Sequence, residues 1–333
     1  MTNLQPIIPP IILSTTMKQS KPEGLGYSRV DNPSRLHLEQ RLAQLEKAKF
    51  ALAFSSGSAA ITTILATLHF GDEIICHQEV YEGTLRLLKK VFANFGIKTI
   101  FTDVNKLKSI SKNTKLIWLE NITNPSLQII DIHKICLRLK SKRVKIAVDN
   151  TLATPIFQNP LLQGADMVIH SLTKFINGHH DVTAGAIMLN NKRIFEKLKS
   201  LQINLGAIPS PFDCFLIERG VETLPLRMKQ HQLNTQKIAE FLKSQTEIEK
   251  VSFPGFSGLF SFWIKGNKNK VLKFLIKLKH IKIAHSFGGS LSTILHPASM
   301  MTMTNPVEEN LVRLSVGLEN VQLVINDIKQ ALR

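Results

Sequence analysis

Between about residues 50 and 190 the chain alternates short, continuously apolar runs with segments of helical spacing, and this alternation constrains its fold more than any other feature. The run Lys145–Asp149 is apolar at successive positions, as is typical of a strand buried on both faces. Strands that alternate with helices predict an α/β architecture with a mainly parallel sheet. Seven strands are expected, at Phe50–Phe54, Glu73–His77, Lys98–Thr102, Lys115–Glu120, Val144–Asp149, Met167–His170 and Gly185–Leu189. The helices expected between them include Ala59–Leu68, Thr84–Phe95 and Ile132–Leu139.

Outside this region the pattern changes. Helical or apolar segments follow at Met228–Lys243, Val251–Ile264, Lys270–Leu278 and Asn320–Leu332. We therefore expect three parts: a Pro-rich arm and helix over residues 1–46, a large domain over 47–227 and a smaller α+β domain over 228–333.

A formal net charge of +17 makes nucleic acid the first partner to consider. The densest basic stretch is Arg138–Lys145, however, and the other lysines are dispersed. No zinc-finger spacing or aromatic-rich RNA-binding motif is present, and only two Trp and two Tyr are available to stack on bases. We interpret the charge as a solvated, lysine-rich surface and expect no nucleic-acid partner.

The cysteines and the hydropathy point to a cytoplasmic protein without a membrane partner. The chain contains three widely spaced cysteines: Cys76, Cys136 and Cys214. Their number and spacing exclude a disulfide framework and fit a reducing compartment. No apolar run reaches the roughly 18 residues of a membrane span, and the apolar stretch Ile7–Leu13 contains two prolines and lacks the basic flank of a signal peptide.

Polar residues follow several strands at their carboxyl ends, the edge where ligands of parallel sheets bind. Gly57 lies in a small-residue turn that opens a helix, which indicates either an anion site or a plain helix start capped by serine. Asp149 ends a buried strand and needs a partner, either the next turn or a cationic ligand group.

Lys174 follows another buried strand, between Leu172 and Phe175. Apolar surroundings disfavour the charged amine, and a neutral amine can form a Schiff base with an aldehyde. The alternative is a side chain that extends to solvent. The nearby run His179-His180-Asp181 has the composition of a metal site, but adjacent residues point in different directions, and we expect no metal.

These features match the requirements of pyridoxal 5'-phosphate, which needs a lysine, a carboxylate for its pyridinium nitrogen and an anion site for its phosphate. Lys174, Asp149 and the turn at Gly57 could supply all three. We therefore expect this cofactor.

At these residues the chain resembles the Cys/Met-metabolism family of pyridoxal-phosphate enzymes, the trans-sulfuration group. The resemblance implies the pyridoxal-phosphate-dependent transferase fold (fold type I), with a seven-stranded sheet and a smaller C-terminal domain. The matching stretches follow the family's order: Tyr27–Pro33, Ser55–Ile61, Val80–Leu87, Asn124-Pro125, Val148–Pro155, Gly164–Gly185, Ser210–Asp213, His285–Thr302 and Leu311–Glu319.

The resemblance also implies roles for single residues. Lys174 would bind the cofactor aldehyde and then move protons between substrate carbons, Tyr81 would stack on the cofactor ring and assist proton transfer, and Asp149 would pair with the pyridinium. The phosphate would be bound by Gly57, Ser58, Ser171 and Thr173, joined by Tyr27 and Arg29 of a neighbouring subunit. The substrate carboxylate would be bound by Arg313, Asn124 and Ser286.

The implied activity is β- or γ-elimination, or γ-replacement, on a cystathionine-like substrate in cysteine and methionine metabolism. Gly206–Cys214 is most similar to cystathionine γ-lyases, so that reaction is our first expectation. Cystathionine γ-synthase, which Ile130–Cys136 resembles equally well, and cystathionine β-lyase are alternatives. A basic nucleic-acid-binding protein or a non-catalytic relative of the fold is the alternative from a different class.

Several positions depart from the family pattern. Glu82, beside Tyr81, argues against methionine γ-lyase. Leu291 and His285 stand where cystathionine-handling members commonly carry glutamate, which predicts altered recognition of the distal end of the substrate. The arm is short and the loop around Asn305-Pro306 is compact. Because such segments make subunit contacts in relatives, we expect a homodimer with shared active sites, with the homotetramer usual in the family as an alternative.

Overall fold

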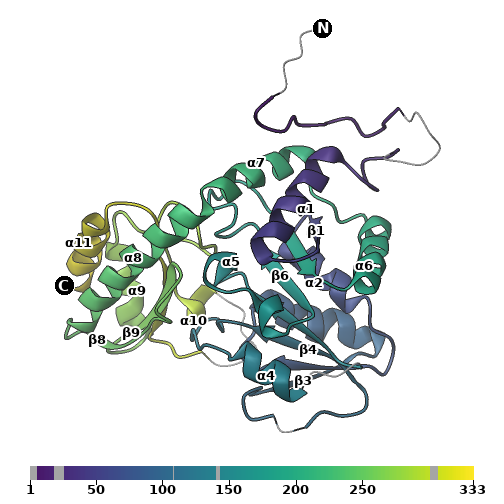
Figure 1. Cartoon of the computed structure of the whole chain (residues 1–333). Coiled ribbons are helices and arrows are strands. Elements are labelled where there is room, and N and C mark those ends of the chain that lie inside the picture. The colour runs from purple at the N-terminus through teal and green to yellow at the C-terminus, as the bar shows by residue number, and fades with distance from the viewer. Residues whose placement is uncertain (1–5, 19–25, 108, 140–142, 301–306) are drawn as a thin grey trace.

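The computed structural model describes residues 6–18, 26–107, 109–139, 143–300 and 307–333 (Figure 1). Part of the basic stretch Arg138–Lys145, the end of the His285–Thr302 stretch and Asn305-Pro306 lie outside the described residues. Among the described helices, none combines the length and the apolar character needed to cross a membrane.

The larger sheet contains the seven expected strands. They are β1 (Phe50–Phe54), β2 (Glu73–His77), β3 (Lys98–Thr102), β4 (Thr114–Glu120), β5 (Lys145–Asp149), β6 (Met167–Ser171) and β7 (Gly185–Leu189). The prediction of a mainly parallel sheet is confirmed, because the order is β1-β7-β6-β5-β4-β2-β3 and only β7 runs against its neighbours.

The register of this sheet brings polar strand ends together. Glu120 at the end of β4 pairs with Asp149 at the end of β5. Across β7, Gly185 pairs with both Phe54 at the end of β1 and Ser171 at the end of β6. The turn after β1 and the residues after β6 therefore meet at the same edge as the two carboxylates.

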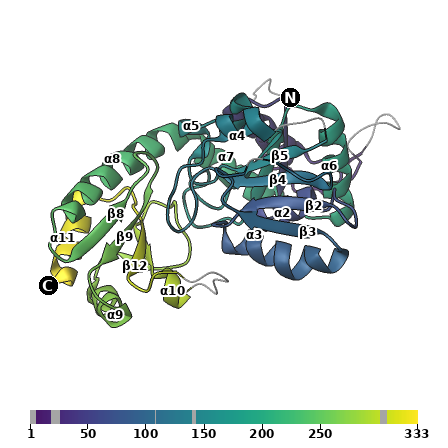
Figure 2. The same ribbon diagram turned by 90° about the horizontal axis from the view of Figure 1, so that it is seen from below.

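Helices cover both faces of the larger sheet (Figures 1 and 2). They include α1 (Pro33–Glu46), α2 (Gly57–Leu65), α4 (Ile132–Leu139), the short α5 (Thr154–Phe157), α6 (Lys192–Leu205) and α7 (Pro211–Glu222), with a 3₁₀ turn at Pro160–Gln163. The expected single helix over Thr84–Phe95 is wrong: the segment forms α3 (Glu82–Arg86), a π-helical turn at Leu87–Val91 and a 3₁₀ turn at Phe92–Phe95. Leu85, Leu88 and Phe92 nevertheless stay buried, which explains why the apolar spacing alone indicated one helix.

The second sheet lies to one side of the first (Figure 2). Its strands are β8 (Ile248–Ser252), β9 (Leu259–Ile264), β10 (Lys282–Ile283), β11 (Thr293–Leu295) and β12 (Leu311–Ser315), in the order β10-β11-β12-β9-β8. The helices of this part are α8 (Leu224–Lys243), α9 (Lys268–Lys277), α10 (Pro297–Met300) and α11 (Val321–Leu332). The expected start of α8 at Met228 is wrong, because Pro225 is tolerated in the first turn, where its missing N–H has no helical partner.

One apolar core joins the two sheets next to the strand ends. Phe175, which follows the last residues of β6, packs against Phe287 and His231 of the second part, with ring centroids 5.8 Å and 5.3 Å away. All three side chains are at least nine-tenths buried. This packing presses the second sheet and its loops against the carboxyl edge of the larger sheet, and closes a cavity there.

Candidate active site

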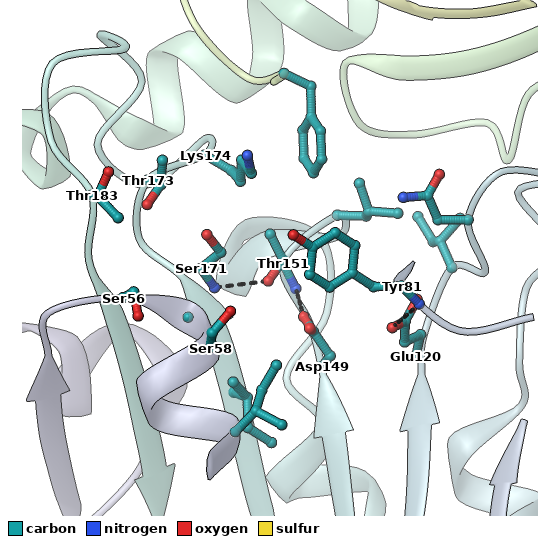
Figure 3. A pocket seen from close by; sticks show the side chains of 17 residues that line it. Ser56, Ser58, Tyr81, Glu120, Asp149, Thr151, Ser171, Thr173, Lys174 and Thr183 are labelled. Carbon is teal, nitrogen blue, oxygen red and sulfur yellow. Dashed lines mark hydrogen bonds between the residues drawn. The ribbon is translucent and has the colours of Figure 1, made fainter. Parts of the chain in front are cut away.

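A cavity of about 290 Å³ opens at the carboxyl edge of the larger sheet (Figure 3). Eight of the residues singled out from the sequence line it: Gly57, Ser58, Tyr81, Asn124, Asp149, Ser171, Thr173 and Lys174. Arg313 and Ser286 stand directly behind the lining, in contact with Asn124 and Lys174 respectively. Tyr27 and Arg29 are not among the lining residues.

Hydroxyl-bearing residues and the start of α2 form one side of the cavity (Figure 3). Ser56 is the N-cap, and its side chain accepts a hydrogen bond from Ala59 N at 3.0 Å. A Cβ on Gly57 would lie 3.2 Å from Ser171 Cβ, so the glycine keeps the space between the helix start and Ser171 open. The interpretation of a helix start capped by serine is confirmed, and the anion site stays a prediction, which the open space beside the first N–H groups of the helix supports.

Thr173 lines the same side, but its hydroxyl is engaged by the backbone. Its Oγ1 donates to Ala184 O at 3.2 Å and accepts from Ala184 N at 3.0 Å. A phosphate on this side would meet the helix start and the Ser58 and Ser171 side chains without displacing a backbone contact.

Asp149 lies at the floor of the cavity (Figure 3). Its Oδ1 accepts from Thr151 N at 3.0 Å, so the carboxylate caps the next turn as one interpretation anticipated. Burial raises the pKa of this carboxyl, while the hydrogen bonds from Thr151 and the nearby His170 lower it. Among the described residues, no basic side chain pairs with Asp149 at ion-pair distance, which leaves it free to bind a cationic ring nitrogen.

Glu120 is a site residue that the sequence reasoning missed. It is 4% exposed, lines the cavity, and its Oε1 accepts from Tyr81 N at 2.6 Å. Burial and the neighbouring charge of Asp149 raise the pKa of Glu120 well above its ordinary value. Its position at a strand end, the same signal that identified Asp149, could have found it.

Lys174 holds its amine at the cavity wall, so the alternative of a side chain extended to solvent is wrong. Its Nζ donates to Ser286 Oγ at 3.0 Å. Burial, aided by the charge of Arg313, lowers the pKa of Lys174 to about 8. With that pKa, about one amine in ten is neutral at pH 7, against about one in three thousand for an ordinary lysine.

Arg313, in the middle of β12, is a buried cation. It is 3% exposed, and burial lowers its pKa to about 10, which leaves it charged at neutral pH. Nη1 donates to Asn124 Oδ1 at 3.0 Å and Nη2 donates to His285 O at 3.4 Å. Within the part of the chain that the structure describes, it forms no ion pair with a carboxylate. A ligand carboxylate beside Arg313 would supply the missing charge.

Tyr81 stands at the mouth of the cavity and is 41% exposed. Burial of its ring raises the pKa of the phenol, which is opposed by the charge of Arg86. Arg86 in turn forms an ion pair with Glu82, one of the residues that depart from the family pattern. Leu291, the other departure, is 53% exposed and does not line the cavity.

Tyr27 and Arg29 lie together outside the cavity of their own chain. Arg29 Cζ is 5.5 Å from the ring centroid of Tyr27, and its Nη1 donates to Ile203 O at 2.7 Å. The expectation that both serve the site of a neighbouring subunit therefore stays a prediction.

The run His179-His180-Asp181 does not form a metal cluster. His179 Nδ1 bonds Asn177 O at 2.6 Å and Asp181 Oδ1 accepts from Asn177 Nδ2 at 2.7 Å. No group of three candidate ligands gathers anywhere in the described ranges.

Comparisons with known proteins agree with this site. Cystathionine γ-lyases of Bos taurus and Dictyostelium discoideum are each 41% identical to the chain, covering 99% of it and 89% and 94% of the relatives. Among solved structures, metB of Corynebacterium glutamicum matches with a TM-score of 0.95 and 39% identity over 98% of this chain and 92% of that one. Cystathionine γ-lyase of Lactobacillus plantarum, complexed with L-serine, matches with a TM-score of 0.93 and 34% identity over 97% and 92%.

These similarities confirm the expected fold type I and extend over the whole cavity. The model of the family described as Cys/Met metabolism PLP-dependent enzyme matches residues 2–333. The chain therefore belongs to the Cys/Met metabolism family of pyridoxal-phosphate-dependent enzymes.

Proposed function

We propose that the protein is a carbon–sulfur lyase of the trans-sulfuration type that acts on cystathionine, with γ-elimination as its reaction. The observation that carries this proposal is the amine of Lys174, which donates to Ser286 Oγ at 3.0 Å beside the cavity, together with the buried guanidinium of Arg313, which contacts Asn124 behind the same lining. The relatives named cystathionine γ-lyase support the choice of substrate.

The residues present fit the three polar groups of pyridoxal 5'-phosphate. The helix start at Gly57, with Ser58 and Ser171, would hold the phosphate, and Thr173 would line the same side. Asp149 would hold the ring nitrogen and Lys174 the aldehyde. Tyr81 would stack on the ring from the mouth of the cavity. When bound, the cofactor supplies an electron sink for the bond at the substrate Cα.

The chain's own groups would bind the substrate and move its protons. Arg313, with Asn124, would hold the carboxylate by a two-pronged hydrogen bond. The neutral amine of Lys174 can accept the Cα proton and, because its stem is flexible, a second proton from Cβ. The Cγ–S bond then breaks and releases cysteine, while water converts the remaining four carbons into 2-oxobutanoate and ammonia.

Further proposals concern the organisation of the protein. We infer a large cofactor-binding domain over 47–227, a small domain over 228–333 and an arm over 1–46. We also infer a cytoplasmic homodimer in which the partner's copies of Tyr27 and Arg29 complete the phosphate site, with a tetramer as the higher assembly. The exposure of Tyr27, at 47%, supports this arrangement.

The test uses purified protein with added pyridoxal phosphate and cystathionine. We expect visible absorbance of the bound cofactor, and production of cysteine and 2-oxobutanoate. Homocysteine and pyruvate as products would identify β-elimination instead. Lys174→Ala should abolish both absorbance and turnover, whereas Lys192→Ala, at an exposed helix position, should retain both. Absorbance without turnover of cystathionine, cysteine, methionine or O-succinylhomoserine plus cysteine would refute the proposed function.

A further inference from the structure

A single aromatic ring faces both cations of the candidate site. Lys174 Nζ lies 4.9 Å from the ring centroid of Phe287, and Arg313 Cζ lies 5.3 Å from the same centroid. Phe287 is 7% exposed and lines the cavity. Within the described ranges, Lys174 forms no ion pair with a carboxylate, so the ring and Ser286 Oγ are the contacts that its amine has.

The backbone around Phe287 fixes the ring in this place. Gly288 N donates to Ser315 Oγ at 3.0 Å, and Ser286 O accepts from Thr293 Oγ1 at 3.0 Å. Gly288 has a φ of +86°, and a Cβ there would come 2.7 Å from Phe175 N. The loop therefore cannot shift the ring away from the two cations without breaking its contacts with β11, β12 and Phe175.

We propose that Phe287 is a positioning residue: its ring stabilises the ammonium form of Lys174 and so sets the pH at which the amine becomes a base. The face of an aromatic ring is negative and attracts a cation within about 6 Å, most strongly where water is excluded. The inference rests on the proposed function in that it treats this amine as the base.

A neighbouring positive charge disfavours the ammonium form of the Lys174 amine, so a contact with the negative face of a ring stabilises that form. Arg313 disfavours the ammonium form of Lys174, and the charge of Lys174 in turn lowers the pKa of His180. The remaining titratable groups of the cavity are Tyr81, Asp149 and Glu120, and the pKa of each is raised by burial. The ring of Phe287 thus opposes the repulsion from Arg313, and an aliphatic side chain of similar size would not.

The test measures the pKa of the Lys174 amine directly, without turnover. Full-length protein is freed of cofactor by dialysis, and the pH midpoint of Lys174 acetylation is determined by competitive labelling and peptide mass spectrometry. We expect a midpoint near 8 in the unaltered protein. Phe287→Leu should lower the midpoint by about half a unit, a threefold change in the ratio of neutral to charged amine.

Two further variants keep the test decisive if Phe287→Leu folds poorly. Phe287→3,4,5-trifluorophenylalanine keeps the shape of the ring but weakens its negative face, and should lower the midpoint in the same direction. Phe274→Leu removes a ring that is 3% exposed and packs on Phe262, and should leave the midpoint unchanged.

An unchanged or raised midpoint in both Phe287 variants would show that the ring only fills space and would overturn the inference. Because labelling needs no substrate, that result is independent of which amino acid the enzyme cleaves. In the loaded enzyme, the acidic limb of the kcat profile should move to lower pH by the same amount.

Discussion

Replacing Arg313 with methionine should weaken catalysis strongly while leaving the fold as stable as before. The guanidinium is 3% exposed and has two hydrogen bonds, to Asn124 Oδ1 and His285 O, but no carboxylate partner among the described residues. Burying such an ion costs several kcal/mol, and two charged hydrogen bonds return about 3 kcal/mol. We therefore expect the free energy of unfolding of Arg313→Met to lie within about 1 kcal/mol of the unaltered protein, on the stabilising side.

A second buried arginine provides the matched control. Arg227 is 7% exposed, and burial lowers its pKa to about 10, as for Arg313. It donates to Phe175 O, Ile176 O, Gly220 O and Thr223 Oγ1, at 2.6–3.0 Å. Arg227→Met leaves these acceptors without a donor, and we expect it to destabilise the protein by about 3–5 kcal/mol.

Urea unfolding of the cofactor-free proteins measures both changes, and kinetics measures the other half of the prediction. Loss of a paired carboxylate contact worth about 3 kcal/mol should lower kcat/KM of Arg313→Met at least about 150-fold. Since the charge of Arg313 lowers the pKa of Lys174, the acidic limb of the profile should also move to higher pH. Destabilisation of Arg313→Met as large as that of Arg227→Met would refute the reasoning, because it would mean that the charge is satisfied inside the fold.

Three further outcomes are expected. Lys174 has a pKa of about 8 in the folded chain and an ordinary pKa when unfolded, so the unfolded state binds more protons between about pH 8 and 10.5. Urea titrations should therefore show that the unaltered protein gains stability relative to Lys174→Met across that window, by at most about 3 kcal/mol. A difference in stability that does not change with pH would contradict the assignment. Gly57→Ala places a Cβ 3.2 Å from Ser171 Cβ in the anion cradle, so equilibrium dialysis should show at least about tenfold weaker cofactor binding, while the free energy of unfolding changes little. Equal affinity would exclude the cradle as the phosphate site. If subunits share sites, mixing refolded Arg29→Ala and Lys174→Ala chains should restore about a quarter of the activity, since half the dimers carry one intact site of two. No restoration from two inactive variants would refute the sharing of sites, and an active Arg29→Ala variant would place Arg29 outside the site.

The larger sheet could be predicted from the sequence because each of its strands can be recognised from its own residues, without knowledge of its neighbours. Each is an apolar run bounded by turn residues, and the structure moves none of their ends by more than one residue. The segment Thr84–Phe95 could not be read this way, since its buried side chains keep their spacing while the backbone passes from α-helical to π-helical and 3₁₀ hydrogen bonding. Apolar spacing records which side faces the core, not which carbonyl accepts each N–H.

The candidate site also contains residues that the sequence could predict and one that it could not. Gly57, Asp149 and Lys174 lie at or just after strand ends, which a list of strands already locates. Phe287 could not be found in this way, because it comes from a loop of the second part and meets Lys174 only through packing between the two sheets. The sequence shows an ordinary apolar residue there, and its two cationic neighbours lie 113 and 26 positions away.

The missed residue Glu120 clarifies why Asp149 can act as the charged carboxylate of the pair. The two side chains leave adjacent parallel strands at the same register position, where burial raises the pKa of both. Two neighbouring buried carboxyls do not both ionise, and the one with more stabilising contacts ionises first. Asp149 has hydrogen bonds from Thr151 and the field of His170, whereas Glu120 has one backbone N–H, from Tyr81. Of the two carboxyls, Asp149 therefore ionises first, and a cationic ring nitrogen above the floor of the cavity would find its counter-charge there.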